Sequence, residues 1–320
     1  MKQLFTALIL FCFCFAVQAQ QAPQYSLYMF NKLNYNPAYA GLDHSLSATG
    51  IYRKQWQGLE GSPTTQSFNV HMPLYIIGGG IGINLENDVL GAERLSTASL
   101  AYSWQRNLGN GILSAGLSGG IVQRMLDGSK LRTPDGNYLE DVPDHADNIL
   151  PIGTETAIVP SFSAGAYYQT ERFEVGIAAR NLAEQSAKLG LLNLKLNRHY
   201  FFNFGLNFDI SRSLSIHPSL LLKSDFIQTQ AEISTIVRYN DNIFAGASFR
   251  GYNTNSMDAV VIMAGFKLSE KITLAYAYDL TLSDLSVVSN GSHEIMLNYN
   301  LNKRIGAGQP PRIIYNPRSL

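Results

Sequence analysis

Hydrophobic and polar residues alternate with a period of two along much of this chain. In residues 200–210 (YFFNFGLNFDI), every even position is apolar, while Asn203, Gly205 and Asn207 fall between them. This period places alternate side chains on opposite faces of a β-strand, and the length suits a tilted membrane strand of ~9–11 residues. A helix would give the stretch no apolar stripe. The pattern therefore predicts a strand.

The same alternation recurs and predicts about fourteen strands, an even number that lets a single-chain barrel close. They span roughly residues 45–53, 65–73, 80–88, 96–108, 112–124, 159–170, 172–181, 198–210, 214–223, 227–239, 243–251, 258–268, 271–279 and 292–301. Pro218 lies inside one of them. Because proline lacks the backbone donor, we expect a local bulge there.

The connections between the predicted strands sort by length. Short, turn-forming connections fall at alternate junctions, at residues 109–111, 171, 211–213, 240–242 and 269–270, and the longest connections are 125–158 and 182–197. Outer-membrane barrels have short periplasmic turns and longer extracellular loops. We therefore predict an all-β protein, a transmembrane antiparallel β-barrel of this topology in the cell outer membrane, with both termini periplasmic.

Aromatic residues near the predicted strand ends fit the same class of protein. Membrane interfaces favour rings with an apolar body and a polar tip, although the ordinary β-propensity of Tyr and Phe explains part of the pattern. The residues concerned are Tyr102, Trp104, Tyr167, Tyr168, Tyr276 and Tyr278.

The amino terminus has the three parts of a secretory signal. Lys2 is followed by an apolar run over residues 4–15, and residues 17–19 (VQA) suit a signal peptidase. We expect cleavage after Ala19. Both cysteines, Cys12 and Cys14, lie in the apolar run, so the expected mature chain has no disulfide or thiolate site. No later stretch of ~18 apolar residues predicts a transmembrane helix.

Charge and candidate chemistry give no enzymatic prediction. The chain has 24 basic and 24 acidic residues, so electrostatics give no reason to expect nucleic acid as a partner. The acidic connection 125–158 does not continue into a twelve-residue calcium loop, and the six histidines form no zinc motif. We predict no catalytic residue, no cofactor and no metal site, although a serine–histidine hydrolase inside a barrel is a distant alternative.

The predicted lumen faces carry charges of both signs, and the sequence leaves their role open. They could line an open pore or pair with one another and fill it. The residues are Arg180, Lys223, Arg238 and Lys267, with Glu174, Glu232 and Asp209 as possible partners.

The segment before the first predicted strand is unlike that of a generic porin. Residues 24–31 (QYSLYMFN) and 36–41 (NPAYAG) are followed by 52–56 (YRKQW) and 61–66 (GSPTTQ). In this order after a signal peptide, these motifs resemble the PorP/SprF family of the Bacteroidota type IX secretion system. Weaker similarity continues in residues 218–220, 246–250 (GASFR), 278–279 (YD) and 291–297 (GSHEIML).

The resemblance implies a non-enzymatic outer-membrane barrel that works with periplasmic type IX machinery and with secreted cargo, such as gliding adhesins. A passive diffusion porin is the alternative. We divide the chain into a signal peptide (1–19), a periplasmic or lumen segment (20–44), the barrel (45–301) and a periplasmic tail (302–320). The segment could be a lumen plug, a docking segment or a structural closure of the barrel end, and Arg53 and Trp56 could anchor the loop that follows. Candidates for plugging or partner binding are Tyr28, Phe30, Asn36, Pro37, Tyr39, Gly41, Arg53, Trp56, Pro63 and Thr64.

Overall fold

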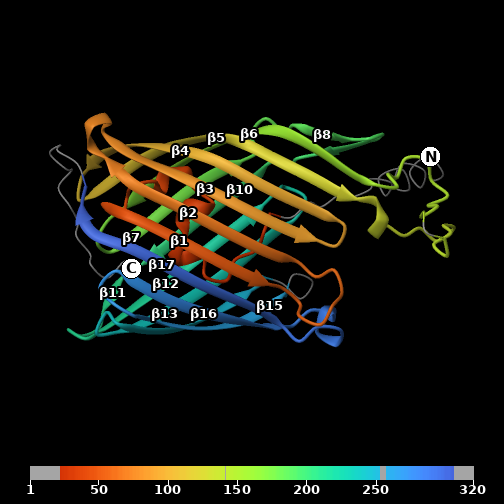
Figure 1. The fold of residues 1–320 in the computed structure, drawn as a ribbon. Helices are drawn as coiled ribbons and strands as arrows, with labels where there is room; N and C mark the ends of the chain where they lie inside the picture. The colour runs from red at the N-terminus through yellow and green to blue at the C-terminus, as the bar shows by residue number, and fades with distance from the viewer. Residues whose placement is uncertain (1–21, 141, 253–256, 306–320) are drawn as a thin grey trace, which may run out of the picture.

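The computed structural model describes residues 22–140, 142–252 and 257–305. The expected signal peptide (1–19) and residues 306–320 of the expected tail lie outside the described residues. Within them, the predicted all-β barrel is confirmed: fourteen antiparallel strands form one closed barrel (Figure 1). Each strand pairs with the next along the chain, and the first pairs with the last to close the ring.

The barrel strands extend the predicted ones by a few residues at several ends. They are β1 (Ser45–Lys54), β2 (Thr64–Leu74), β3 (Gly79–Leu90), β4 (Glu93–Leu108), β5 (Gly111–Asp127), β6 (Thr154–Gln169), β7 (Phe173–Arg180), β10 (His199–Leu206), β12 (Leu214–Ser224), β13 (Thr229–Tyr239), β14 (Ile243–Arg250), β15 (Ala259–Lys267), β16 (Ile272–Thr281) and β17 (Ser292–Arg304). A two-residue strand, β11 (Phe208–Asp209), continues β10 along β12.

The alternation that predicted the strands sorts side chains between the lumen and the outer surface. On β17, Ile295 and Leu297 are about half exposed on the outside, whereas Glu294 and Met296 are buried inside. Large apolar side chains are exposed in the same way on most barrel strands. Such an apolar outer surface around a polar interior is expected when lipid surrounds the barrel.

The predicted bulge at Pro218 is wrong. Pro218 stands opposite Thr235 in an unbroken register between β12 and β13. On the other side of β12, pairing stops between β10 and β11 and resumes in the same register, so no extra residue is inserted. The missing proline donor is thus accommodated by a local gap in pairing between β10 and β11.

Connections of different length lie at the two ends of the barrel (Figure 1). At one end, the short-turn end, they are residues 75–78, which contain η4 (Tyr75–Ile77), and 109–110, 170–172, 210–213, 240–242 and 268–271. At the other, the long-loop end, they are 55–63, 91–92, 128–153, 181–198, 225–228, 251–258 and 282–291. Two connections at the long-loop end are exceptions: residues 91–92 form a tight turn, and residues 225–228 are no longer than the longest connections at the short-turn end.

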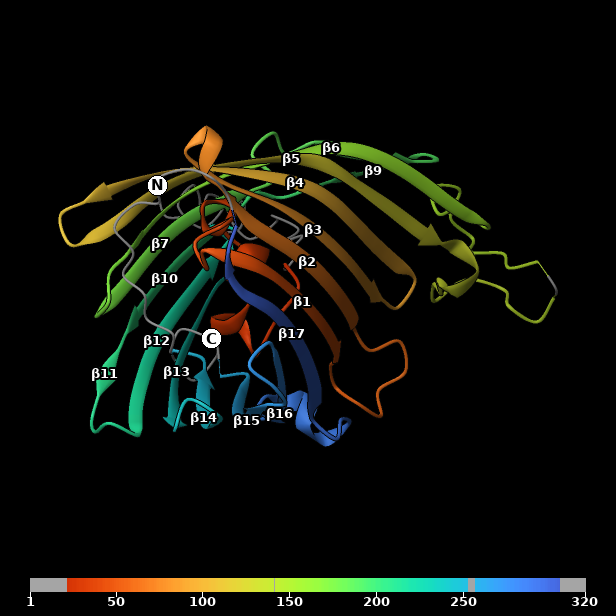
Figure 2. The ribbon, with the colours of Figure 1, turned by 60° about the vertical axis from the view of Figure 1, so that its left-hand side comes forward.

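Two of the long connections are partly ordered. The connection predicted as a loop at 182–197 contains a hairpin of β8 (Ser186–Leu189) and β9 (Leu192–Lys195), which packs against β6. The 128–153 connection starts with η5 (Gly128–Lys130) and projects away from the barrel (Figure 2). The connection before β17 contains η6 (Asp284–Val287).

β17 also corrects a predicted boundary. It runs to Arg304, so residues 302–304, assigned to the tail, belong to the last strand. The register between β1 and β17 shifts near its end, where Asn302 has a positive φ of 53°. Among the described residues, no helix is long and apolar enough to cross a membrane.

Candidate functional site in the barrel lumen

Residues 22–44 lie inside the barrel, and we call them the lumen segment. They form three short 3-10 turns: η1 (Tyr28–Phe30), η2 (Lys32–Asn34) and η3 (Pro37–Tyr39). Asn36 caps the third turn by accepting a hydrogen bond from the N–H of Ala38 at 3.0 Å, and Pro37 has the fixed φ that suits the first turn position. Every residue from Gln24 to Leu42 is buried except Met29 and Phe30, which are partly buried.

The lumen segment crosses the barrel from one end to the other. Ala22 lies at the long-loop end, where its carbonyl accepts a hydrogen bond from Lys223 near the end of β12. Ala40 lies near the short-turn end, where its carbonyl accepts bonds from Ser103 at 2.6 Å and Gln105 at 2.9 Å on β4. The described chain therefore starts at the opposite end of the barrel from the first residue of β1.

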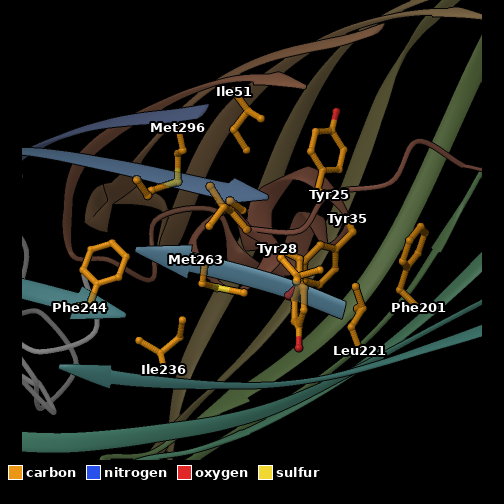
Figure 3. Packing of buried hydrophobic residues seen from close by; sticks show 14 of the residues in the cluster. Tyr25, Tyr28, Tyr35, Ile51, Phe201, Leu221, Ile236, Phe244, Met263 and Met296 are labelled. Carbon is orange, nitrogen blue, oxygen red and sulfur yellow. The ribbon is translucent and has the colours of Figure 1, made fainter. Parts of the chain in front are cut away.

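An apolar cluster joins the lumen segment to the barrel wall (Figure 3). Tyr25, Leu27, Tyr28 and Tyr35 of the segment are buried in it, and Phe30 packs 4.8 Å from the ring of Phe244. The labelled wall residues of the cluster are Ile51, Phe201, Leu221, Ile236, Phe244, Met263 and Met296. Apolar side chains on inward positions of these strands thus serve the segment as a core.

A buried ionic network holds the start of the lumen segment. Ser26 is its centre: its hydroxyl donates to Asp279 at 2.7 Å and accepts from Arg53 at 2.9 Å and Arg250 at 2.8 Å. The backbone N–H groups of Ser26 and Leu27 both donate to the carboxylate of Glu294. The hydroxyl of Ser26 and the two backbone N–H groups are therefore bound by side chains from four strands, β1, β14, β16 and β17.

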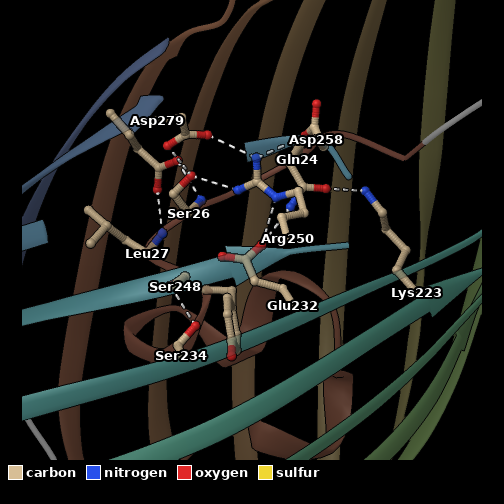
Figure 4. A network of polar contacts seen from close by, with 12 residues as sticks. Gln24, Ser26, Leu27, Lys223, Glu232, Ser234, Ser248, Arg250, Asp258 and Asp279 are labelled. Atoms are coloured by element: carbon tan, nitrogen blue, oxygen red, sulfur yellow. Dashed lines mark hydrogen bonds and ion pairs between the residues drawn. The ribbon is translucent and has the colours of Figure 1, made fainter. Parts of the chain in front are cut away.

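The wall residues of this network also pair with one another (Figure 4). Arg53 contacts Asp279 at 2.7 Å and Glu294 at 3.0 Å, and Arg250 contacts Glu232 at 2.8 Å and Asp279 at 2.9 Å. Arg53 stands directly opposite Glu294 across β1 and β17, and Glu232 stands opposite Arg250 across β13 and β14. Their side chains are at most 2% exposed.

Because its charges are buried, the network stabilises the fold only while every charge keeps its partners. A buried ion pair recovers its desolvation cost only with good geometry and further hydrogen bonds, but removing one partner leaves an uncompensated charge. The hydroxyl of Ser26 and the amides of Ser26 and Leu27 supply such further bonds. The lumen segment thus completes a network that the wall alone would leave short of donors.

A second group of polar contacts holds the remainder of the segment. Lys32 pairs with Glu174 of β7 at 2.5 Å, and the side-chain amide of Asn36 donates to the carbonyls of Ala166 and Ile177. The N–H of Gly41 donates to His71 at 3.0 Å. The contacts of Lys32 and Asn36 reach β6 and β7, across the lumen from the ionic network, whereas His71 lies on β2, next to β1.

Tyr25 links the lumen segment to β3. Its hydroxyl donates to Glu86 at 2.8 Å. Because Glu86 also pairs with Arg180 of β7 at 3.1 Å, this contact joins the segment to both strands.

Glycines on the wall make room for the segment. A Cβ on Gly116 would overlap the backbone of Pro37 and Ala38, and one on Gly165 would overlap the side-chain oxygen of Asn36. Gly41 itself has a φ of +76°, in the region that favours glycine, and lies against Met72 and Pro73. The segment and the wall thus approach to backbone contact.

The predicted site residues fall into two groups. Those that lie in the lumen, buried or partly buried, are Tyr28, Phe30, Asn36, Pro37, Tyr39, Gly41 and Arg53. Those at the long-loop end are Trp56, Pro63 and Thr64. Arg53 points into the lumen network, so it does not anchor the following loop. That loop is held by Lys54, which donates to Thr64, and by the N–H of Gln55, which donates to Pro63.

Two of the predicted lumen cations contact partners other than the carboxylates that the sequence offered. Arg180 contacts Glu86, and Lys223 donates to Gln24 at 2.6 Å. Tyr167, predicted at the membrane interface, instead points inward and packs 5.2 Å from the ring of Tyr39. Because Tyr167 and Tyr168 are adjacent on one strand, only one of them can face outward.

Ser26, Asp279, Glu294 and Arg250 are site residues that the sequence did not single out. Three of them were within reach of a sequence signal, because Asp279, Glu294 and Arg250 each lie in a motif that resembles the PorP/SprF family. Their alternation phase also places these charges on the inward face near the same end of the barrel. Ser26 lies in a segment without period-two alternation, so the sequence did not predict which way its side chain points.

Small cavities remain between the lumen segment and the wall. A cavity of about 30 Å³ remains beside the segment, lined by polar groups that include Asn84, Ser99, Ser118 and Arg180, and it has room for a water or two. At the long-loop end, a larger recess of about 560 Å³ opens above the segment. We call this recess the vestibule; its lining includes Ala22, Pro23, Trp56, Lys223, Tyr252 and Leu285.

These features define a class: an outer-membrane β-barrel whose lumen is occupied by its own N-terminal segment. The chain matches the family described as "Type IX secretion system membrane protein PorP/SprF" over residues 17–299. It therefore belongs to the PorP/SprF family, as the motifs predicted, and is an outer-membrane component of the type IX secretion system.

Comparison with other known proteins adds little detail. No curated protein matches the chain. Among solved structures, the toluene transporter TbuX of Ralstonia pickettii is 11% identical, with a TM-score of 0.48, over 87% of this chain and 93% of that one. The Acinetobacter baumannii protein Omp33 is 7% identical, with a TM-score of 0.45, over 80% of this chain and 95% of that one. Scores below 0.5 leave the assignment to the family match.

Proposed function

We propose that this protein serves the secretion or surface attachment of type IX cargo, such as gliding adhesins, by recognising proteins at its two mouths and without bond chemistry. The observation that carries the proposal is the occupied lumen. A barrel filled by a buried, hydrogen-bonded segment offers its end surfaces to partners and offers solutes little free passage.

The difference in connection length between the two ends supports different partners at the two mouths. In outer-membrane barrels, short turns face the periplasm and long loops face the exterior. On that orientation, the short-turn end meets periplasmic type IX machinery, and the long-loop end, with its projecting 128–153 connection, meets secreted cargo. In the projecting connection Leu139 is 97% exposed and Val142 is 63% exposed, as at surfaces that bind proteins.

Conductance distinguishes this proposal from the passive porin. Purified protein in planar bilayers is expected to show little steady conductance, because residues 22–44 fill the lumen. A variant that lacks residues 22–43 keeps all barrel strands and is expected to conduct. Large, steady conductance of the intact protein, equal to that of the deletion variant, would support the porin instead.

Crosslinking in cells tests the partners. A photoreactive residue is placed at Leu139 in a long loop and, as its matched control, at Asn110 in a short turn. The proposal expects secreted protein to be captured from position 139 and periplasmic machinery from position 110. If neither position captures a protein of the secretion system, the recognition function is wrong.

A further inference from the structure

The lumen segment runs in one direction along the barrel axis. Lys223, which binds the carbonyl of Ala22 at 3.0 Å and Gln24 at 2.6 Å, lies next to the last residue of β12 at the long-loop end. Ser26 lies one step deeper, among residues near the same ends of β1, β14, β16 and β17. The segment is therefore ordered along the barrel axis, with its earliest described residues at the long-loop mouth.

The far end of the segment confirms this direction. The carbonyl of Ala38 accepts from Ser114, near the start of β5, and Lys32 pairs with Glu174, near the start of β7. Both starts lie at the short-turn end. From Ser26 to Ala40 the segment thus passes through the length of the lumen, and its first residue and the first residue of β1 lie at opposite mouths.

We infer that the start of the lumen segment, Ala22 and Pro23, is displayed at the long-loop mouth, in the vestibule. This differs from the expectation that both termini are periplasmic, which rested on the alternation of short and long connections between the strands. Both residues line the vestibule of about 560 Å³, together with Trp56 and Leu285.

The inference has a consequence for recognition. On the orientation given under the proposed function, on which this step rests, Ala22 and Pro23 are part of the outward surface offered to cargo. The inference also requires removal of the expected signal peptide before the segment is seated, because an uncleaved signal would hold the chain at the inner membrane. The segment would then be absent from the lumen.

Single cysteines test the inference, since the expected mature chain contains none. Ala22→Cys places a thiol at the vestibule, Leu191→Cys places one in the β8–β9 hairpin at the long-loop end, and Asn110→Cys places one in a short turn. Intact cells are treated with a membrane-impermeant maleimide. We expect labelling of the Ala22→Cys and Leu191→Cys proteins, and labelling of Asn110→Cys only after the outer membrane is permeabilised.

The outcomes separate the inference from the proposed orientation. If Leu191→Cys is labelled on intact cells while Ala22→Cys behaves like Asn110→Cys, the start of the lumen segment is not at the long-loop mouth and the inference is overturned. If Asn110→Cys is labelled and Leu191→Cys is not, the orientation itself is reversed. A short epitope inserted after Ala19, compared with the same epitope after Leu320, gives a second measurement: antibody is expected to reach only the former on intact cells.

Discussion

Ser26 shows how much one small side chain can organise. Its hydroxyl makes hydrogen bonds to Arg53, Arg250 and Asp279, all of them buried. A buried charge that lacks a partner is costly. Loss of this single hydroxyl would therefore remove a hydrogen bond from three buried charged groups at once. The lumen segment is thus stabilised less by its own 3-10 turns than by what it supplies to the wall.

Ser26→Ala is expected to destabilise the protein by about 1–3 kcal/mol, because it leaves buried donors and acceptors unsatisfied. The measurement is the free energy of unfolding in urea with the protein in detergent micelles. Ser211→Ala, in an exposed short turn, is the control and should change stability by less than about 0.5 kcal/mol. Equal effects of the two substitutions would show that the network adds nothing.

Gly116→Ala is expected to dislodge the segment, because its Cβ would overlap Pro37 and Ala38. Gly119→Ala lies on the same strand but faces outward, where its Cβ meets Phe162 at an ordinary 3.6 Å. We expect higher bilayer conductance and a lower unfolding temperature for Gly116→Ala only. A Gly116→Ala protein indistinguishable from Gly119→Ala would argue against close packing of the segment.

At the scale of elements, alternation located every barrel strand, because period-two patterning is a local property of the sequence. It could not show that connection 182–197 contains a hairpin, since β8 and β9 are four residues each and gain order by packing on β6. Nor could it place residues 22–44, whose path depends on charges brought together from strands far apart in the sequence. Pro218 was misread because a gap in pairing can absorb a missing donor as well as a bulge can.

Trypsin added to intact cells is expected to cut after Lys130 or Arg132, in the projecting 128–153 connection, and to leave Arg212 uncut. Lys130 has a side chain that is 61% exposed, and such loop residues are preferred sites of nicking. Gel electrophoresis and mass spectrometry of the fragments check the result. Cleavage after Arg212 without cleavage in the connection would mean that the short turns face the exterior.

For the whole molecule, closure of the ring depends on one pairing between strands that are distant in the sequence, β1 with β17. Unheated protein in sodium dodecyl sulfate is expected to migrate faster than boiled protein, because the closed barrel stays compact. Glu294 lies at this pairing, whereas Glu232 lies between strands that a short connection joins. Glu294→Gln should therefore lower the temperature at which the migration changes more than Glu232→Gln does. The reverse order would show that the β1–β17 pairing does not limit the stability of the barrel.

The place of Glu294 also bears on how the barrel is assembled. It stands opposite Arg53 at the junction that closes the ring, and it accepts hydrogen bonds from the backbone N–H groups of Ser26 and Leu27. If β17 joined β1 two residues out of register, its carboxylate would miss both the guanidinium and the segment and would be left unpaired in the lumen. A ring closed in the wrong register would therefore lose the hydrogen bonds to the lumen segment as well as the ion pair, so the segment favours the correct closure.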